Sequence, residues 1–307
     1  MLFNAVFRAK ARAALAGHWQ TALLIALIVN LPSLLVQGIG SFTNSDPITR
    51  LQLLALEAAN TGLSADELLS RVGALFSETG VLLMSGFSVL AWIVTPVLSL
   101  GMNHWALDRL RGLSEPVSAV FSRLPVFLKS IGLRLLITLK VILWMLPGVG
   151  VSLLYLIPLN NARNVTSEAE VYAAVNSSIR LLYVGIFVMI ILGVFAYLHY
   201  ALADFILADE PEERILSCVR RSKQHMAGRK GSLLSLVLSF ALWYLLLLFI
   251  TSFLSELSPI LGLLLQMLGS LVLSTYVLLS VGAFYEAVRM APQPSAIQSS
   301  EDENSIE

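Results

Sequence analysis

Six long apolar runs constrain this chain more than any other feature of its sequence. A helix needs about 20 mostly apolar residues to cross the hydrocarbon core of a bilayer. Six segments reach that length, at residues 19–40, 81–104, 131–159, 181–208, 233–254 and 260–285. A helix pairs its backbone N–H and C=O groups within itself, as the bilayer interior requires. The sequence therefore predicts an all-α, polytopic transmembrane bundle of about six spans. Pro147 and Gly148 interrupt the third run, so that span either continues as a kinked helix or turns back on itself.

The composition agrees with a membrane protein. Hydrophobic residues make up 57% of the 307 residues and charged residues only 13%, whereas soluble domains carry about a quarter. The single cysteine, Cys218, excludes an internal disulfide. The first apolar run lacks a small-residue cleavage site, so we expect an uncleaved span. We expect residues 1–290 to form one integral membrane domain, and the polar, acidic residues 291–307 to form a disordered cytoplasmic tail.

The basic residues predict an orientation. If the N-terminus is cytoplasmic, the inner side carries fifteen of the 20 Lys and Arg residues and the outer side four. The inner set is Arg8, Lys10, Arg12, Arg109, Arg111, Arg123, Lys129, Arg134, Arg214, Arg220, Arg221, Lys223, Arg229, Lys230 and Arg289. The outer set is Arg50, Arg71, Arg163 and Arg180. Because cytoplasmic loops are enriched in cations, this bias predicts that both termini are cytoplasmic.

The densest charge lies in ILADEPEERILSCVRRSKQHMAGRKGS, residues 206–232. Pro211 suits a first helical turn, and the acidic residues around it suit the positive end of a helix dipole. Gly228 suits the residue after the helix. One mostly apolar face is formed by Ile215, Val219, Ser222 and Met226. We predict an interfacial helix under the bundle.

The cations of this segment are candidate contacts of anionic lipid headgroups on the cytoplasmic face. They are Arg220, Arg221, Lys223, Arg229 and Lys230. The alternative is a docking surface for an unidentified membrane protein partner. A nucleic-acid patch is the least favoured reading, and we expect no nucleic-acid partner.

Other connections also carry helical patterns. Residues 1–19 predict an amphipathic interfacial helix, and 114–125 show helical spacing closed by a proline. The long outer loop, 41–80, predicts two short amphipathic helices, the second of which begins with a capping box at Ser64–Glu67. A second capping box, Ser167–Glu170, predicts a helix that runs into the fourth span.

Several stretches resemble the bacterial integral membrane family known as domain of unknown function 975 (DUF975). The central one, FILADEPEERILSCVRRSKQHMAGRKGSLLSLVLSFALWYLL, matches at Asp209, Ser222, Met226, Gly228, Ser239, Phe240 and Trp243. ILWMLPGVG matches at Trp144, Pro147 and Gly148, and GAFYEAVR at Phe284, Tyr285 and Glu286. FRAKARAALAGHW resembles the family's opening, and residues 149–195 depart from its usual spacing. The resemblance implies a multi-pass protein of the bacterial inner membrane and no established activity.

No motif in the sequence points to a reaction. The four histidines, His18, His104, His199 and His225, lack the spacing of a zinc site. No G-x-S-x-G, P-loop or G-x-G-x-x-G pattern occurs. His18-Trp19 and His104-Trp105 fall at predicted inner boundaries, where an aromatic belt is the expected explanation. Ser270 and Ser274 have the spacing of a helix-packing motif. We therefore expect no catalytic residue, no metal, no cofactor and no enzymatic activity.

Two charges fall inside predicted spans. Lys140 lies six residues beyond Arg134, about 9 Å deeper, and Asp204 lies four residues before Ala208, about 6 Å deep. A lone charge at the centre of a span costs about 2.5–3.5 kcal/mol on insertion scales. Lys140 and Asp204 are therefore a candidate intramembrane ion pair. The alternative is that Lys140 snorkels to the headgroups and Asp204 lies at the headgroup boundary.

Three classes of function remain open. The first is a non-enzymatic membrane protein with a structural or scaffold role, or a role in envelope or lipid homeostasis. The second is a transporter, or a membrane subunit of one, which would be supported if Asn30, Lys140, His199 and Asp204 shared one cavity. The third and weakest is an intramembrane enzyme that acts on lipid.

Overall fold

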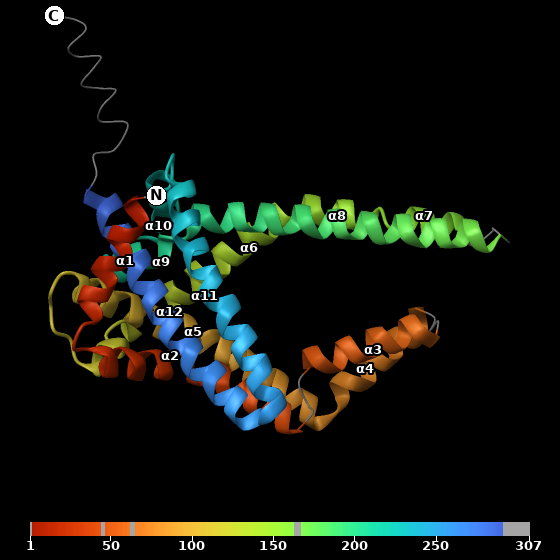
Figure 1. Cartoon of the computed structure of the whole chain (residues 1–307), viewed down its shortest axis with the longest axis horizontal. Coiled ribbons are helices and arrows are strands. Elements are labelled where there is room, and N and C mark those ends of the chain that lie inside the picture. The colour runs from red at the N-terminus through yellow and green to blue at the C-terminus, as the bar shows by residue number, and fades with distance from the viewer. Residues whose placement is uncertain (1, 44–46, 62–64, 163–166, 291–307) are drawn as a thin grey trace, which may run out of the picture. The chain divides into compact units, whose positions relative to one another are not determined.

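The computed structural model describes residues 2–43, 47–61, 65–162 and 167–290, and every regular element in them is helical (Figure 1). Six stretches are long and apolar enough to cross a membrane: Trp19–Val36, Thr79–Leu110, Val117–Pro158, Tyr172–Asp209, Lys230–Leu257 and Ile260–Met290. The predicted all-α architecture with six potential spans is therefore confirmed.

The described chain divides into two compact units, and each is described by itself. The first comprises Met1–Phe7, Leu128–Ala241 and Ala283–Glu307, and the second comprises Arg8–Phe127 and Leu242–Gly282. The long helices α11 (Lys230–Leu257) and α12 (Pro259–Met290) contribute residues to both. The expectation of a single domain over 1–290 stays a prediction, and the expected tail, 291–307, lies outside the described residues.

The second unit is built around α2 (Trp19–Thr43) and α5 (Thr79–Leu110), which pack along each other. Trp105 and Ile25 are fully buried in their shared core. The turn between α1 (Leu2–Leu15) and α2 contains a glycine, Gly17, in the left-handed region with φ +76°. A β-carbon on Gly101 of α5 would lie 1.8 Å from the carbonyl oxygen of Val120, so the two backbones meet there.

Two short helices fill most of the long loop before α5. They are α3 (Pro47–Thr61) and α4 (Ala65–Ser77), which lie side by side (Figure 1). Arg71 of α4 pairs with Glu57 of α3, and Arg50 lies 3.7 Å from Glu78. The prediction of two helices is confirmed, whereas the capping serine of the second lies outside the described residues.

Residues 114–126 differ from the sequence-based expectation. They form two 3-10 turns, η1 (Val117–Phe121) and η2 (Leu124–Val126), in place of one α-helix. Only part of the expected apolar face is used: Val120 is buried, but Phe121 and Leu124 are exposed. Pro125 explains the break, because it supplies no N–H to continue a helix.

In the first unit, α6 (Phe127–Leu153) runs through Pro147 without a break, so residues 147–153 continue the third span. The chain turns only at Leu154 and Tyr155, and α7 (Leu156–Ala162) then packs along α8 (Glu168–Tyr200) (Figure 1). A β-carbon on Gly148 of α6 would lie 2.6 Å from the Cα of Met189 of α8. This close approach is the small-residue packing that stabilises helix pairs in membranes.

The fourth span is not one continuous helix. Helix α8 ends at Tyr200, residues 201–202 form a turn, and α9 (Ala203–Asp209) follows as a separate helix. At the other end of α8, Ser167 occupies the N-cap position but its side chain makes no capping hydrogen bond. The predicted capping box therefore marks the start of the helix without stabilising it in the expected way.

Candidate functional site

The charged segment between the fourth and fifth spans belongs to the first unit. Its helix, α10, covers Ile215–His225, so it begins four residues after Pro211, the expected first-turn residue. The predicted inner face is confirmed, because Val219, Ser222 and Met226 are buried. Gly228 has the expected left-handed conformation, with a φ of +70°, but it lies two residues beyond the C-cap residue Met226, one position later than predicted.

The acidic residues before α10 bind a cation late in the helix. The two terminal nitrogens of Arg221, Nη1 and Nη2, donate to the two carboxylate oxygens of Glu210 at 2.5 and 3.0 Å. Nη1 also lies 3.6 Å from the carboxylate of Glu213. The hydrogen bond from Arg221 lowers the pKa of Glu210 and raises that of Arg221. Such bidentate pairs are stronger than single neutral hydrogen bonds. The acidic residues therefore close a loop by ion pairing, where the sequence suggested an interaction with the helix dipole.

A second ion pair ties the end of α9 to the end of α12. The carboxylate of Asp209 lies 2.7 Å from Arg289 Nη1 and accepts a hydrogen bond of 3.2 Å from the hydroxyl of Tyr285. Tyr285 also stacks on Phe205 of α9, and the neighbouring Phe284 packs edge-to-face on Phe7. Asp209 and Tyr285 belong to two separate stretches of the family signature, and the structure brings them together.

A third contact holds the turn between α8 and α9. The Ser222 hydroxyl donates to the His199 carbonyl at 3.0 Å and accepts from the Leu202 N–H at 3.3 Å. Lys230 Nζ lies 2.6 Å from His199 Nε2 and 4.4 Å from the centroid of the Phe195 ring. The His199 Nδ1 lies 2.8 Å from the Phe195 carbonyl oxygen. This suits the tautomer in which Nδ1 donates and Nε2 accepts from the ammonium.

The five cations proposed to contact lipid headgroups fall into two groups, those with partners among the described residues of the protein and those without. Arg221 and Lys230 have the internal partners given above, which a sequence pattern does not reveal. Arg220 and Lys223 are exposed on α10, one turn apart, and Arg229 is half-buried. Leu216 shares their face and is 70% exposed. An exposed leucine beside two cations is the pattern of a helix at a membrane surface.

The candidate ion pair of Lys140 with Asp204 is not formed in the described part of the chain. The Asp204 carboxylate lies 4.0 Å from the guanidinium of Arg134, which precedes Lys140 by six residues on α6. The depth estimated from sequence assumed one continuous fourth helix, but α8 ends at Tyr200 and Asp204 lies on the separate helix α9, after the turn at 201–202.

A partly buried polar cluster in the second unit was missed from the sequence. His104 Nε2 lies 3.2 Å from the carboxylate of Asp108, and Arg123 Nη2 lies 3.0 Å from His104 Nδ1. The i,i+4 spacing of His104 and Asp108 was the available signal. Trp105 is fully buried beside them, so the expected interfacial belt is wrong for this tryptophan. In the described residues, no group of three or more His, Cys, Asp or Glu side chains could hold a metal ion.

The second unit contains a polar cavity of about 290 Å³ among α2, α11 and α12. Its lining residues are Asn30, Ser33, Leu34, Tyr244, Leu263, Gln266, Met267, Ser270, Leu271 and Ser274. Of the four residues that a transport site was expected to combine, only Asn30 lies here. Ser270 and Ser274, expected at a helix contact, line this cavity.

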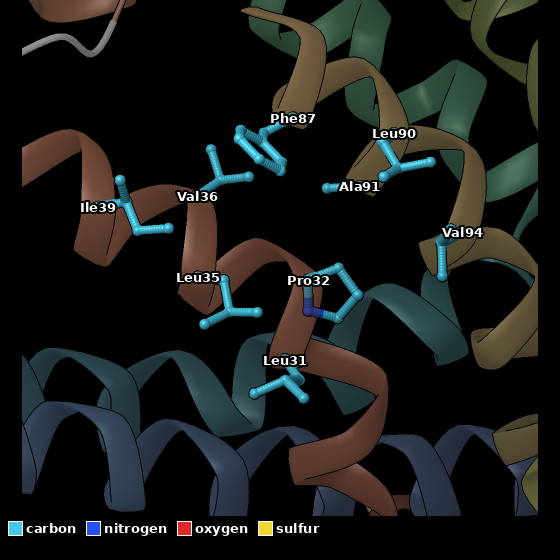
Figure 2. A pocket seen from close by; sticks show the side chains of 9 residues that line it. All are labelled: Leu31, Pro32, Leu35, Val36, Ile39, Phe87, Leu90, Ala91 and Val94. Atoms are coloured by element: carbon cyan, nitrogen blue, oxygen red, sulfur yellow. The ribbon is translucent and has the colours of Figure 1, made fainter. Parts of the chain in front are cut away.

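The opposite face of α2 borders a second, apolar cavity of about 280 Å³ against α5 (Figure 2). Leu31, Pro32, Leu35, Val36 and Ile39 line it from α2, and Phe87, Leu90, Ala91 and Val94 from α5. With no hydrogen-bonding side chain, this lining gives a polar ligand nothing that would orient it. Helix α2 thus separates a polar cavity from an apolar one.

The model of a family described as "Protein of unknown function (DUF975)" matches residues 3–292. No curated protein and no solved structure matches the chain.

Proposed function

The chain belongs to the DUF975 family, and from that premise we propose that it is a non-enzymatic multi-pass protein of the bacterial inner membrane. Both termini lie in the cytoplasm, and the protein acts as a structural scaffold in envelope or lipid homeostasis. The observation that carries this proposal is the internal pairing of the charged segment. Its acidic groups Asp209, Glu210 and Glu213 bind Arg289 and Arg221.

The pairing matters because a catalytic acid or base has to reach a substrate. A carboxylate held by a guanidinium at hydrogen-bond distance is better placed to hold two segments together than to transfer a proton. Two such ion pairs, at Asp209 and Arg221, and the hydrogen bonds of the Ser222 hydroxyl fix the connection from α8 through α10. Two of these three contacts are made by signature residues of the family resemblance, Asp209 with Tyr285 and Ser222.

The membrane itself is the proposed partner. The exposed face of α10, formed by Leu216, Arg220 and Lys223, suits the headgroup region of an anionic leaflet. Each cation near such a surface contributes about 1 kcal/mol. An unidentified membrane protein is the alternative partner for this face.

Hydrogen exchange in nanodiscs tests the lipid contact. In anionic discs, we expect slower exchange over 215–226 than in neutral discs for the unmodified chain. Replacement of Arg220→Gln together with Lys223→Gln should abolish this dependence on lipid charge. The control is Arg180→Gln, an exposed cation of α8 on the predicted outer side. A difference between discs that survives the double substitution contradicts the proposed contact.

The homeostasis role requires a cellular test. A strain that lacks the chain should show altered lipid composition or envelope permeability, and the unmodified gene should restore both. The Arg220→Gln, Lys223→Gln variant should be expressed at a normal level but restore them only in part. Normal envelope and lipids in the deletion strain under all growth conditions tested would count against the proposal.

Transport is the second candidate, and the polar cavity among α2, α11 and α12 favours it. Polar side chains inside spans are costly unless they serve a packing or binding purpose. Uptake measured in vesicles that contain only this chain would support transport, whereas a scaffold shows no solute flux.

A further inference from the structure

The polar cavity of the second unit lies deep within the spans. Asn30 follows Trp19 by eleven residues, about 16 Å along α2, and Tyr244 follows Lys230 by fourteen, about 21 Å along α11. Since a hydrocarbon core is about 30 Å thick, Asn30 falls near its middle and Tyr244 about two thirds of the way across. At that depth no bulk water is present to hydrogen-bond the polar side chains.

The hydrogen bonds within the protein use only some of the donors and acceptors on the side chains that line the cavity. Asn30 Nδ2 donates to the Ala26 carbonyl at 2.8 Å, which leaves its side-chain oxygen as an acceptor. The Gln266 side-chain oxygen accepts from Thr251 at 3.1 Å, which leaves its NH₂ group as a donor. Within the described residues, the Tyr244 hydroxyl has no hydrogen-bond partner.

The serines of the cavity add acceptors. Ser270 and Ser274 donate to carbonyls of their own helix, at 2.9 and 3.1 Å, so their oxygen lone pairs remain available. The lining therefore offers donors from Gln266 and Tyr244 and acceptors from Asn30 and the serines. Because a hydroxyl both donates and accepts hydrogen bonds, an uncharged ligand with several hydroxyls matches this mixture of donors and acceptors.

The lining carries no charge, which disfavours the binding of ions. All ten lining residues are uncharged, so an anion or a cation in the cavity would lack an opposite charge in a medium of low polarity. Tyr244, Leu263 and Gln266 are exposed, and a ligand can therefore enter from the side. The size of the cavity suits a small group.

We propose that this cavity binds an uncharged polyhydroxyl group between glycerol and a hexose in size. The group arrives either as a free polyol or as the head of a neutral lipid. This inference names the ligand class for the cavity on which the transport alternative depends, and it is independent of the scaffold role. Binding is measured at equilibrium, so its failure leaves the test of lipid homeostasis unaffected.

The experiment uses the full chain in neutral detergent with three probes. Glucosyl-dioctanoylglycerol carries a polyhydroxyl head on an uncharged lipid, myo-inositol is a free polyol, and dioctanoyl phosphatidic acid is a charged lipid. Native mass spectrometry counts bound lipid, and calorimetry measures myo-inositol. We expect saturable binding of one molecule per chain for glucosyl-dioctanoylglycerol or for myo-inositol, and which of the two binds identifies the source. Phosphatidic acid should bind at least tenfold more weakly than the preferred probe.

Two substitutions locate the site. Gln266→Leu removes a donor from an exposed position, and Ser270→Ala removes an acceptor with little change in volume. Each should weaken binding about 3- to 10-fold, the effect of one lost hydrogen bond. Gln20→Leu is the matched control, because Gln20 is exposed on α2 outside the cavity, and it should change nothing.

Three results would overturn the proposal. The first is that neither uncharged probe binds saturably, and the second is that Gln266→Leu and Gln20→Leu bind equally well. The third is that Gln266→Leu converts a dimer to a monomer in the mass spectrum, because that would assign the polar face to a second copy of the chain.

Discussion

Arg221 and Arg220 are neighbours in sequence but have different surroundings, which yields a sharp prediction. Arg221→Met removes the guanidinium that Glu210 and Glu213 bind. Arg220→Met removes an exposed cation from the same helix. The first substitution should therefore destabilise α10 and its preceding loop, and the second should leave their stability within about 0.5 kcal/mol of the original.

The structure sets the expected size of the effect. A hydrogen bond to a charged group contributes about 1.5–3 kcal/mol, and two are lost with Arg221. The Glu210 and Glu213 side chains are 39% and 31% exposed, so water rehydrates them once the partner is gone, and this lowers the cost. We expect a loss of about 1–2 kcal/mol, which makes local opening of α10 roughly 5- to 30-fold more frequent.

Hydrogen exchange over 211–226 measures this opening directly. Because Arg221 lowers the pKa of Glu210 in the folded chain, the stabilisation is fully present above the unfolded-state pKa of about 4.3. It is lost as the pH falls through the lower folded-state value. The difference between the original chain and Arg221→Met should therefore be largest near neutral pH and shrink in acid. Equal protection in Arg221→Met and Arg220→Met at pH 7 would refute the assignment of Arg221 as a structural residue.

Three further outcomes follow from the described contacts. Burial raises the pKa of Cys218 to about 11, so a maleimide at pH 7 should label the folded chain slowly and the denatured chain fast; equal rates would contradict the burial. Gly101→Ala should lower stability by about 1–3 kcal/mol in thermal unfolding, because its β-carbon would overlap the backbone of η1; an unchanged midpoint would contradict that contact. A double-mutant cycle should show coupling between Arg134→Met and Asp204→Leu and none between Lys140→Met and Asp204→Leu; the reverse pattern would restore the pair suggested by the sequence.

The spans and amphipathic helices could be predicted because each depends on local periodicity. The apolar face of α10, with Val219 and Met226, follows from helical spacing alone. The third span could not be settled in the same way, because Pro147 permits either a kinked helix or a reversal. In the structure, α6 continues through Pro147 as one helix. Gly148 of this helix allows α6 to approach α8 closely.

The partners of charged residues could not be predicted, because they depend on where the chain turns. The two-residue turn at 201–202 separates α9 from α8, and Asp204 lies 4.0 Å from Arg134 in place of Lys140. Likewise, Asp209 lies 76 residues before Tyr285, and only the tertiary structure brings them together. The family resemblance marked both residues without showing that they touch.

Side-specific cysteine labelling tests the central claim, a multi-pass protein with a cytoplasmic cation-rich face, most directly. Leu69→Cys on α4 and Leu216→Cys on α10 place single thiols at positions that are each 70% exposed, and buried Cys218 adds little background. A membrane-impermeant maleimide on intact spheroplasts should label Leu69→Cys, and it should label Leu216→Cys only after permeabilisation. Labelling of Leu216→Cys in intact spheroplasts, with Leu69→Cys protected, would contradict the account.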